Sequence, residues 1–225
     1  MNSMYQQLMQ LPLFQGVSTD SITQLVEKFP FHFLKYRNAE QIFAAGDIST
    51  HIRFIVSGKV RLETPCAHLK VSLLQTLSTP NVLAPEYLFG RETVYPYTAV
   101  AEGPCGILQL RKSDYIKMIN SDKVFLFNIL NYLSSGSQRG VASALSVKDG
   151  SVAERLALLV DMLTVPGATD IILRYKQKDL CTLMSTQRTT LVSSLDRLSE
   201  QDILDYDCNE LRLLDYRRLM DLIKE

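Results

Sequence analysis

Residues 177–199 read QKDLCTLMSTQRTTLVSSLDRLS and contain two short helical patterns separated by a turn. The apolar side of the first pattern consists of Leu180, Leu183 and Met184. The buried side of the second consists of Leu191, Leu195 and Leu198, which recur at steps of four and three residues. Ser185 and Thr186 suit the turn, and we expect Thr186 to cap the second helix. Two short helices joined in this way predict a helix-turn-helix.

The side of the second helix opposite its leucines is polar, and its first two turns carry no acidic residue. The side chains on it are Gln187, Arg188, Thr189, Ser193 and Arg197. An arginine can pair with guanine through two hydrogen bonds and a glutamine with adenine, while hydroxyls and backbone amides suit phosphate. This face therefore predicts a helix that reads DNA.

Two short alternating patterns follow, at residues 203–206 and 210–213, around a turn at residues 207–209. They predict a β-hairpin, and a hairpin directly after a helix-turn-helix is a wing. Upstream, residues 148–151 indicate a domain boundary, after which residues 152–163 predict a helix.

The N-terminal half has a different periodicity. Residues 18–29 predict a helix that Ser18 or Thr19 caps, and from residue 31 the apolar pattern changes to a period of two. Turns are expected at residues 46–47 and 57–59. We expect short strands near residues 31–36, 41–43, 51–56, 60–63, 71–77, 98–101 and 106–111. Many short strands with frequent turns predict a β-sandwich or barrel.

Helical patterns return at residues 115–119 and over the longer segment 121–147. A stripe at near-heptad spacing follows this segment through Leu126, Leu130, Leu133, Ser137, Val141, Ala144 and Lys148. Such a stripe is typical of helices that pair, although a helix that packs only within its own chain has the same periodicity. The small residues in its middle, Ser134, Ser135, Gly136, Ser137 and Gly140, permit close helix approach or a kink.

The composition narrows the function classes. The 225 residues are 46% hydrophobic and 21% charged, as in a globular protein, and the net charge is zero, which argues against a non-specific nucleic-acid coat protein. No apolar run approaches the roughly 20 residues of a membrane span. No signal peptide is visible at the N-terminus, so we expect a cytoplasmic protein without a membrane partner. The four cysteines form no CxxC pair and are interpreted as free thiols.

The order of these parts resembles the catabolite-activator and fumarate–nitrate-regulator superfamily of bacterial transcription regulators, called Crp/Fnr-like here. Residues 42–62 are similar to its cyclic-nucleotide-binding β-roll, residues 152–160 to the helix that opens its DNA-binding domain, and residues 177–204 to its helix-turn-helix. The resemblance implies an α+β fold with an N-terminal cyclic-nucleotide-binding-type β-roll, a long dimerisation helix and a C-terminal winged helix-turn-helix. The implied domains are a sensor at 1–120, a dimerisation helix and hinge at 121–150, and a DNA-binding domain at 151–225.

The resemblance also implies partners and roles. Arg188, Thr189 and Ser193 match base-reading positions, and Gln187 and Thr190 lie beside them. The implied assembly is a homodimer, joined through the 121–147 helices, that binds a double-stranded DNA operator of two-fold symmetry. RNA polymerase is a further partner that the family implies.

The implied effector pocket departs from the family pattern. The family's phosphate-binding segment carries Gly-Glu-Leu and Arg-Ser/Thr-Ala, where this chain has Pro85-Glu86-Tyr87 and Tyr97-Thr98-Ala99. Proline has no N–H to donate, and a tyrosine replaces the arginine that would neutralise a cyclic phosphate. A cyclic nucleotide is therefore disfavoured, and the effector is not identified. The expected pocket residues are Glu86, Tyr87, Arg91, Tyr97, Thr98 and Ser137.

Other function classes have weaker sequence support. No catalytic motif occurs, so we expect no enzyme activity, and no cysteine cluster suits iron–sulfur ligation. A haem sensor is an alternative, because the N-terminal half contains the candidate ligands His32, His51 and His68. No second-ligand pattern accompanies these histidines, however, and no metal site is expected. Residues 151–225 carry 10 basic and 13 acidic residues, a net charge of −3. That balance keeps an alternative open, in which a ligand-binding or interaction protein of Crp-like fold has lost DNA or effector binding.

Overall fold

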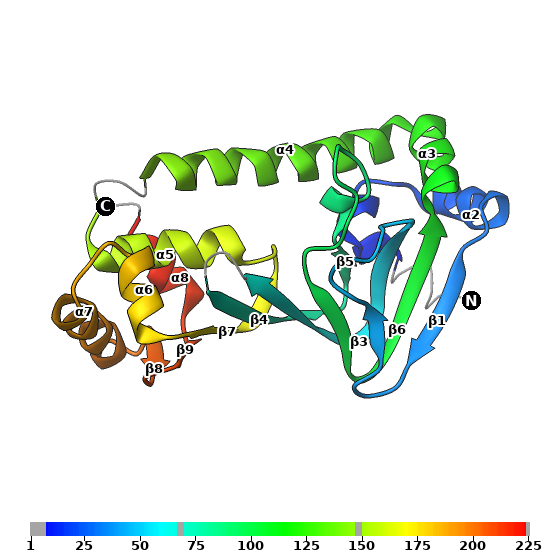
Figure 1. Cartoon of the computed structure of the whole chain (residues 1–225). Helices are drawn as coiled ribbons and strands as arrows, with labels where there is room; N and C mark the ends of the chain where they lie inside the picture. Colours follow the sequence, from blue (N-terminus) through cyan, green and yellow to red (C-terminus); the bar gives the residue numbers. More distant parts are fainter. Residues whose placement is uncertain (1–7, 67–69, 147–149, 224–225) are drawn as a thin grey trace. The chain divides into compact units, whose positions relative to one another are not determined.

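The computed structural model describes residues 8–66, 70–146 and 150–223 (Figure 1). The chain forms two compact units. The first consists of Met1–Arg61 and Leu77–Gly136, and the second of Leu62–Thr76 and Ser137–Glu225. The second unit therefore includes a short segment, Leu62–Thr76, from within the sequence range predicted for the sensor. Each unit is described separately below.

The first unit combines an antiparallel β-roll with helices. Its elements are η1 (Pro12–Phe14), α2 (Thr19–Lys28), β1 (His32–Tyr36), β2 (Gln41–Phe43), the first part of β3 (His51–Cys66), the end of β4 (Val71–Ser78), β5 (Asn81–Leu83), η2 (Pro85–Tyr87), β6 (Thr98–Arg111), α3 (Lys112–Ser121) and the first part of α4 (Lys123–Ser146). Strand β6 lies between β1 and β3, β2 also pairs with β6, and β5 pairs with β3. The α+β class and the roll are as predicted.

The turn predicted at residues 57–59 is wrong, because β3 continues through it as one strand. Gly58 makes this continuation possible. It has a φ of +81°, and a Cβ at this position would collide with the carbonyl oxygen of Pro104. The glycine thus permits a close approach of β3 and β6, which the sequence alone presents as a turn signal. The two strands predicted at 98–101 and 106–111 are likewise one strand, β6.

Helix α4 is anchored to the roll by aromatic packing. The ring of Phe125 lies edge-on to that of Phe14, 5.1 Å away, and Phe14 packs in the same way on Phe54 of β3, at 5.3 Å. The side-chain amide of Asn128 donates to the carbonyl oxygens of Leu13 and Gln15, at 3.1 and 2.8 Å. One side of the first part of α4 is therefore fixed against the first unit. A few residues after Gln15, the Ser18 hydroxyl caps α2 as predicted, accepting from Ser21 N.

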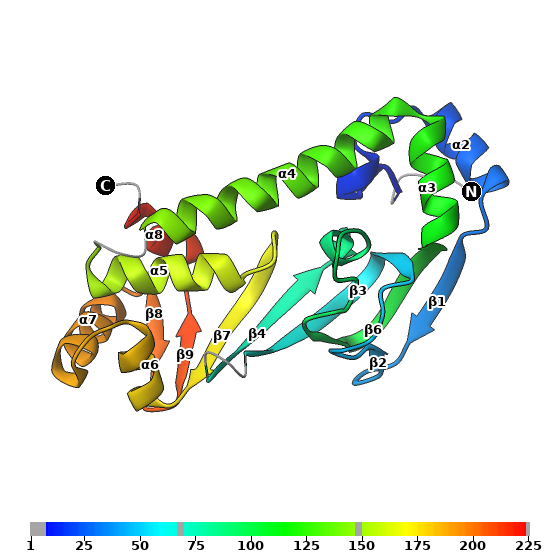
Figure 2. The ribbon, with the colours of Figure 1, turned by 45° about the horizontal axis from the view of Figure 1, so that its top comes forward.

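The described residues of the second unit form a sheet, the end of α4 and several shorter helices. Its further elements are α5 (Val152–Leu163), β7 (Ala168–Tyr175), α6 (Gln177–Leu183), α7 (Arg188–Glu200), β8 (Leu204–Tyr206), β9 (Glu210–Leu213) and α8 (Tyr216–Asp221). The strand order in this unit is β4-β7-β9-β8, and β9 is antiparallel to β7 and β8 (Figure 2). The sequence predicts α5, α6, α7 and the β8–β9 hairpin, but neither β7 nor α8.

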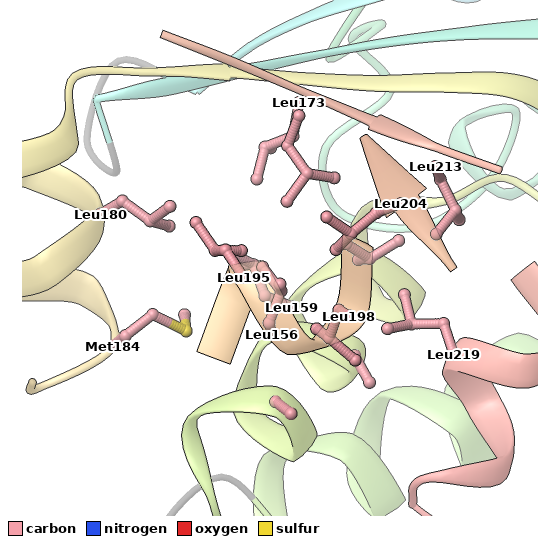
Figure 3. Packing of buried hydrophobic residues seen from close by; sticks show 14 of the residues in the cluster. Leu156, Leu159, Leu173, Leu180, Met184, Leu195, Leu198, Leu204, Leu213 and Leu219 are labelled. Atoms are coloured by element: carbon pink, nitrogen blue, oxygen red, sulfur yellow. The ribbon is translucent and has the colours of Figure 1, made fainter. Parts of the chain in front are cut away.

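The core of the second unit is built mainly from leucines. Leu195 and Leu198 of α7 lie close to Leu156 and Leu159 of α5 and to Leu204 of β8 (Figure 3). Helix α5 begins with a capping box, in which Ser151 Oγ accepts from Glu154 N and Glu154 Oε2 accepts from Ser151 N. These contacts bury the leucine side of α7 in the core and leave its polar side exposed.

The segment Leu62–Thr76 is an integral part of this unit. Val71 and Leu73 belong to its core. Gln75 is buried, and its side-chain amide donates to Leu163 O at 3.2 Å while its oxygen accepts from Val165 N at 2.8 Å. Both ends of this amide thus satisfy backbone groups in the connection between α5 and β7. Among the described residues, no helix is long and apolar enough to span a membrane.

Candidate functional site

Helices α6 and α7 are joined by a tight turn whose geometry comes from backbone hydrogen bonds. Ser185 adopts a left-handed conformation with a φ of +48°, and Thr186 N donates to Cys181 O at 3.0 Å. The predicted turn at Ser185-Thr186 is confirmed. The predicted cap is wrong, because the N-cap of α7 is Gln187, whose side chain makes no capping hydrogen bond.

The N-terminal end of α7 is open and free of negative charge. Its first turn has no acidic residue, and the helix is 13 residues long, so its positive dipole end faces outward without a side-chain acceptor. All predicted DNA-binding side chains are exposed: Gln187, Arg188, Thr189, Thr190, Ser193 and Arg197. The leucines on the other side are buried as predicted. This end of α7 can therefore offer donors to phosphates and base edges.

The predicted residues divide into two groups. Thr190, Ser193 and Arg197 line a pocket of about 390 Å³, which they share with residues at the start of α5. Gln187, Arg188 and Thr189 lie outside that pocket, at the N-terminal end of the helix. Sequence reasoning missed Arg155, which also lines the pocket; its signal is a basic residue in the first turns of the helix at 152–163.

The β8–β9 hairpin holds α7 through a side-chain hydrogen bond. The Tyr206 hydroxyl donates to Asp196 Oδ1 at 2.5 Å, and this hydrogen bond is the main reason why the pKa of Tyr206 rises to about 12. At the hairpin turn, the Asp207 carboxylate accepts from Asn209 N and Glu210 N, which lowers the pKa of Asp207. These contacts fix the orientation of the hairpin relative to α7.

If this unit binds DNA, we expect Lys176, Lys178 and Arg212, all of which are exposed, to form one connected basic face with Arg188 and Arg197. Arg212 lies 3.8 Å from Glu210, and Arg174 lies 3.2 Å from the same carboxylate. The Glu210 carboxylate therefore neutralises part of the positive charge of Arg174 and Arg212. That these cations and Arg188 act as one face remains a prediction.

The expected effector pocket contains aromatic side chains where the family carries a cation. Tyr97 is 3% exposed, and its ring lies 6.5 Å from that of Tyr87 and 6.0 Å from that of Phe43. Burial, with a smaller effect of Glu86, raises the pKa of Tyr97 well above its ordinary value. The phenol is thus neutral and cannot balance an anion.

The other expected pocket residues give little support for a cyclic phosphate. Glu86 and Arg91 are exposed, and Pro85 is buried at the start of η2 without an N–H. Thr98 Oγ1 accepts from Ala45 N at 3.1 Å, and Ser137 belongs to the second unit. The residues at these positions do not fit a cyclic nucleotide phosphate.

Sequence reasoning missed Arg53, which the structure brings beside the aromatic cluster. Its guanidinium lies 5.5 Å from the centre of the Phe43 ring and donates through Nη1 to the Tyr95 hydroxyl. The rings of Phe43 and Tyr95 stack at 3.8 Å. Contacts with Phe43 and Tyr95 therefore hold this cation, which the linear spacing of the segment does not reveal.

Two tyrosines of this cluster give a matched stability test. The Tyr97 hydroxyl is buried and has no hydrogen-bond partner among the described residues, whereas the Tyr95 hydroxyl accepts from Ser49 and Arg53. We expect Tyr97→Phe to raise the free energy of unfolding by about 1 kcal/mol and Tyr95→Phe to lower it by about 1–3 kcal/mol. Chemical denaturation of both variants measures the difference. An equal loss in both would show that the Tyr97 hydroxyl has a partner.

The histidines and cysteines give no metal site in the described part of the chain, where no group of three suitable side chains is found. His51 has a lowered pKa, chiefly through burial. His68 lies outside the described residues. Cys105 is buried, which raises its pKa to about 11, and Cys208 is exposed. Cys105, Cys181 and Cys208 are free thiols, as predicted.

The chain is similar to a known domain family and to several solved structures. Residues 33–122 match the family model of the Cyclic nucleotide-binding domain. A CooA mutant from Carboxydothermus hydrogenoformans is 16% identical over 89% of this chain and 90% of its own, with a TM-score of 0.50, which shows a common fold. The Thermus thermophilus Catabolite Activator Protein is 20% identical over 95% and 98%, with a TM-score of 0.49. FixK2 from Bradyrhizobium japonicum is 18% identical over 86% and 97%, with a TM-score of 0.46. No curated protein matches significantly.

Proposed function

We propose that this chain, whose residues 33–122 match the family model of the Cyclic nucleotide-binding domain, is a homodimeric, sequence-specific DNA-binding transcription regulator of the Crp/Fnr type. In this proposal α6, α7 and the β8–β9 hairpin are a winged helix-turn-helix, and α7 enters the major groove. The observation that carries it is the exposed, acid-free N-terminal end of α7, supported from behind by buried leucines. The protein acts in the cytoplasm, and RNA polymerase is a further partner.

The dimer would form along α4. Phe127 and Leu130 are 60% and 47% exposed, although the opposite side of the same helix is buried in the roll. Val141 is also an exposed apolar residue of α4, at 59%, and it follows Leu130 by eleven residues, or about three helical turns. Leu130 and Val141 belong to the predicted stripe, whereas Leu133 packs partly against its own unit. A second copy of the helix is the partner that this spacing fits.

An effector would act by shifting the population of α4 pairings. A Cβ built at Gly136 or Gly140 would meet no heavy atom within 4 Å, so packing among the described residues does not require these glycines. They are available for close contact with a second helix or for a change in helix geometry. The pairing of α4 would set the spacing of the two α7 helices against successive major grooves, about 34 Å apart.

The effector itself is a small molecule other than a cyclic nucleotide in this proposal. The buried, neutral Tyr97 and the missing N–H of Pro85 support it, because neither position supplies the positive charge or the N–H donor that the family uses for an anionic phosphate. The alternative is an interaction protein of the same fold that no longer binds DNA, which the net charge of −3 over residues 151–225 favours.

Selection from a random pool of DNA duplexes distinguishes the two functions. The purified full-length chain is incubated with the pool at a fixed salt concentration, and bound duplexes are amplified over several rounds. We expect enrichment of a motif with two-fold symmetry, whose half-sites are centred about 10 base pairs apart or a multiple of that distance. Enrichment of no motif at all would favour the interaction protein.

A further inference from the structure

Asp196 lies on the same stripe of α7 as two of the side chains that match base-reading positions. Thr189, Ser193 and Asp196 follow one another at steps of four and three residues, which places them on one face of the helix. All three are exposed. Any contact that fixes the direction of Asp196 therefore also fixes the direction in which Thr189 and Ser193 face.

The other contacts of α7 control this direction less tightly. Its leucines lie in the core, where apolar contacts are non-directional. At the C-terminal end Ile203 N donates to Leu198 O at 3.0 Å, whereas at the N-terminal end the side chain of Gln187 makes no capping hydrogen bond. In the described part of the chain, Asp196 is the only side chain of α7 that hydrogen-bonds to another element.

The partner of Asp196 is Tyr206 of β8, whose hydroxyl donates to Asp196 Oδ1 at 2.5 Å. Leu204, two residues earlier in the same strand, lies in the core close to Leu195 and Leu198 of α7 (Figure 3). Since residues two apart in a strand point to the same face, Tyr206 lies on the face of β8 that is turned toward α7. The hydroxyl thus meets the helix beside its buried side.

The hairpin that carries Tyr206 is itself fixed to the sheet. Tyr206 pairs with Leu211 of β9, and β9 pairs in turn with β7. Tyr175 of β7 is buried, and its hydroxyl donates to Asp207 O at 3.0 Å in the hairpin turn. Its backbone N donates to Asn209 O at 2.8 Å in the same turn. Tyr206 therefore donates to α7 from a strand whose position is set by the rest of the sheet.

We propose that Tyr206 is a positioning residue for DNA reading, whose hydrogen bond to Asp196 sets the rotation of α7 about its axis and so orients Thr189 and Ser193. This inference rests on the proposed function. A recognition site needs its side chains within about 0.5 Å or 10–20° of the productive geometry. Contacts with phosphate carry no sequence information directly. Loss of the hydrogen bond should therefore reduce the preference for the operator more than the attraction to DNA in general.

The DNA arm of the test compares Tyr206→Phe with Tyr216→Phe. Tyr216 of α8 gives a matched control, because its hydroxyl donates to Asp161 Oδ1 of α5 at the same distance of 2.5 Å, within the same unit. The measured quantity is the ratio of the affinities of the full-length chain for the selected operator and for a scrambled duplex. We expect Tyr206→Phe to lower this ratio about tenfold and Tyr216→Phe to leave it unchanged.

Two substitutions of Asp196 separate the hydrogen bond from the charge. Asp196→Asn keeps Oδ1 as an acceptor for the Tyr206 hydroxyl, so the ratio should stay at the wild-type value. Asp196→Ala removes the acceptor and should lower the ratio as Tyr206→Phe does. A ratio that falls in Tyr206→Phe but not in Asp196→Ala would show that the hydroxyl contacts DNA itself, which overturns the proposal. An unchanged ratio in Tyr206→Phe, or an equal loss in Tyr216→Phe, would also overturn it.

The second arm measures amide hydrogen exchange of the full-length chain without DNA. If Tyr206 fixes α7, exchange in α7 should be faster in Tyr206→Phe and remain at the wild-type rate in Tyr216→Phe. A wild-type chain that shows no preference among duplexes would contradict the proposed function. The exchange arm would then still decide whether Tyr206 positions α7, because an unchanged rate in Tyr206→Phe would overturn that role independently of DNA.

Discussion

Replacement of Phe127 and Leu130 by glutamate on α4 should convert the proposed dimer to a monomer and weaken operator binding by about 10²–10⁴-fold. The two half-sites are then bound independently, and the gain from linking two binding modules, which has this magnitude, is lost. Both side chains are largely exposed in the single chain, so the change leaves the core of the roll intact. In a helix pair, however, the new carboxylates would be buried without partners.

The measurement combines sedimentation of the variant with titration of a full operator and of a half-site. Ile116→Glu is the matched control, because Ile116 is an exposed apolar residue of the same unit that lies on α3. The control should remain a dimer with wild-type affinity. A Phe127→Glu/Leu130→Glu variant that remains dimeric would show that α4 does not form the interface. One that is monomeric with full operator affinity would show that dimerisation does not support DNA binding.

Arg188→Ala should remove discrimination of roughly 1–3 kcal/mol at one base position in each half-site. Arg188 is exposed at the start of α7, where no acidic side chain in the first turn competes for its guanidinium. An arginine at such a position can make two hydrogen bonds to the O6 and N7 acceptors of guanine, which alanine cannot replace. Since the proposed operator has two half-sites, the dimer loses this discrimination energy once in each half-site.

The measurement is a competition between the selected operator and duplexes with each base pair changed in turn. The variant should lose preference at one symmetric pair of positions and keep it at the others. Arg217→Ala is the control, and it should leave every preference unchanged. If Arg188→Ala weakens binding to all duplexes equally, Arg188 contacts phosphate and does not read a base.

The elements around α7 could be predicted because their signals are local. Leu156, Leu159 and Leu163 follow the helical period in α5, as Leu191, Leu195 and Leu198 do in α7. Strand β7 gave no such signal, because its place is set by its neighbours in the sheet, β4 and β9. The continuity of β3 was equally hidden, since Gly58 signals a turn until the nearby backbone of Pro104 is known.

The site shows the same division between local and distant contacts. The polar face of α7 follows from its own sequence, whereas Arg155 reaches the pocket only through the packing of α5 on α7. Arg53 and Tyr95 are 42 residues apart, and their hydrogen bond follows from the fold of the roll. Gln75 bridges to Leu163 over 88 residues, which places a segment of the predicted sensor range in the second unit. Composition and period carry no information about such pairs.

In the proposed function α7 reads a DNA sequence, although the basic and acidic residues of the protein balance to zero net charge and give little non-specific attraction to DNA. The most direct measurement is the ratio of the affinities of the wild-type chain for the selected operator and for a scrambled duplex of equal length, at one physiological salt concentration. We predict a ratio of about 10³ or more, with two chains bound per operator. Equal affinity for the two duplexes would contradict the account.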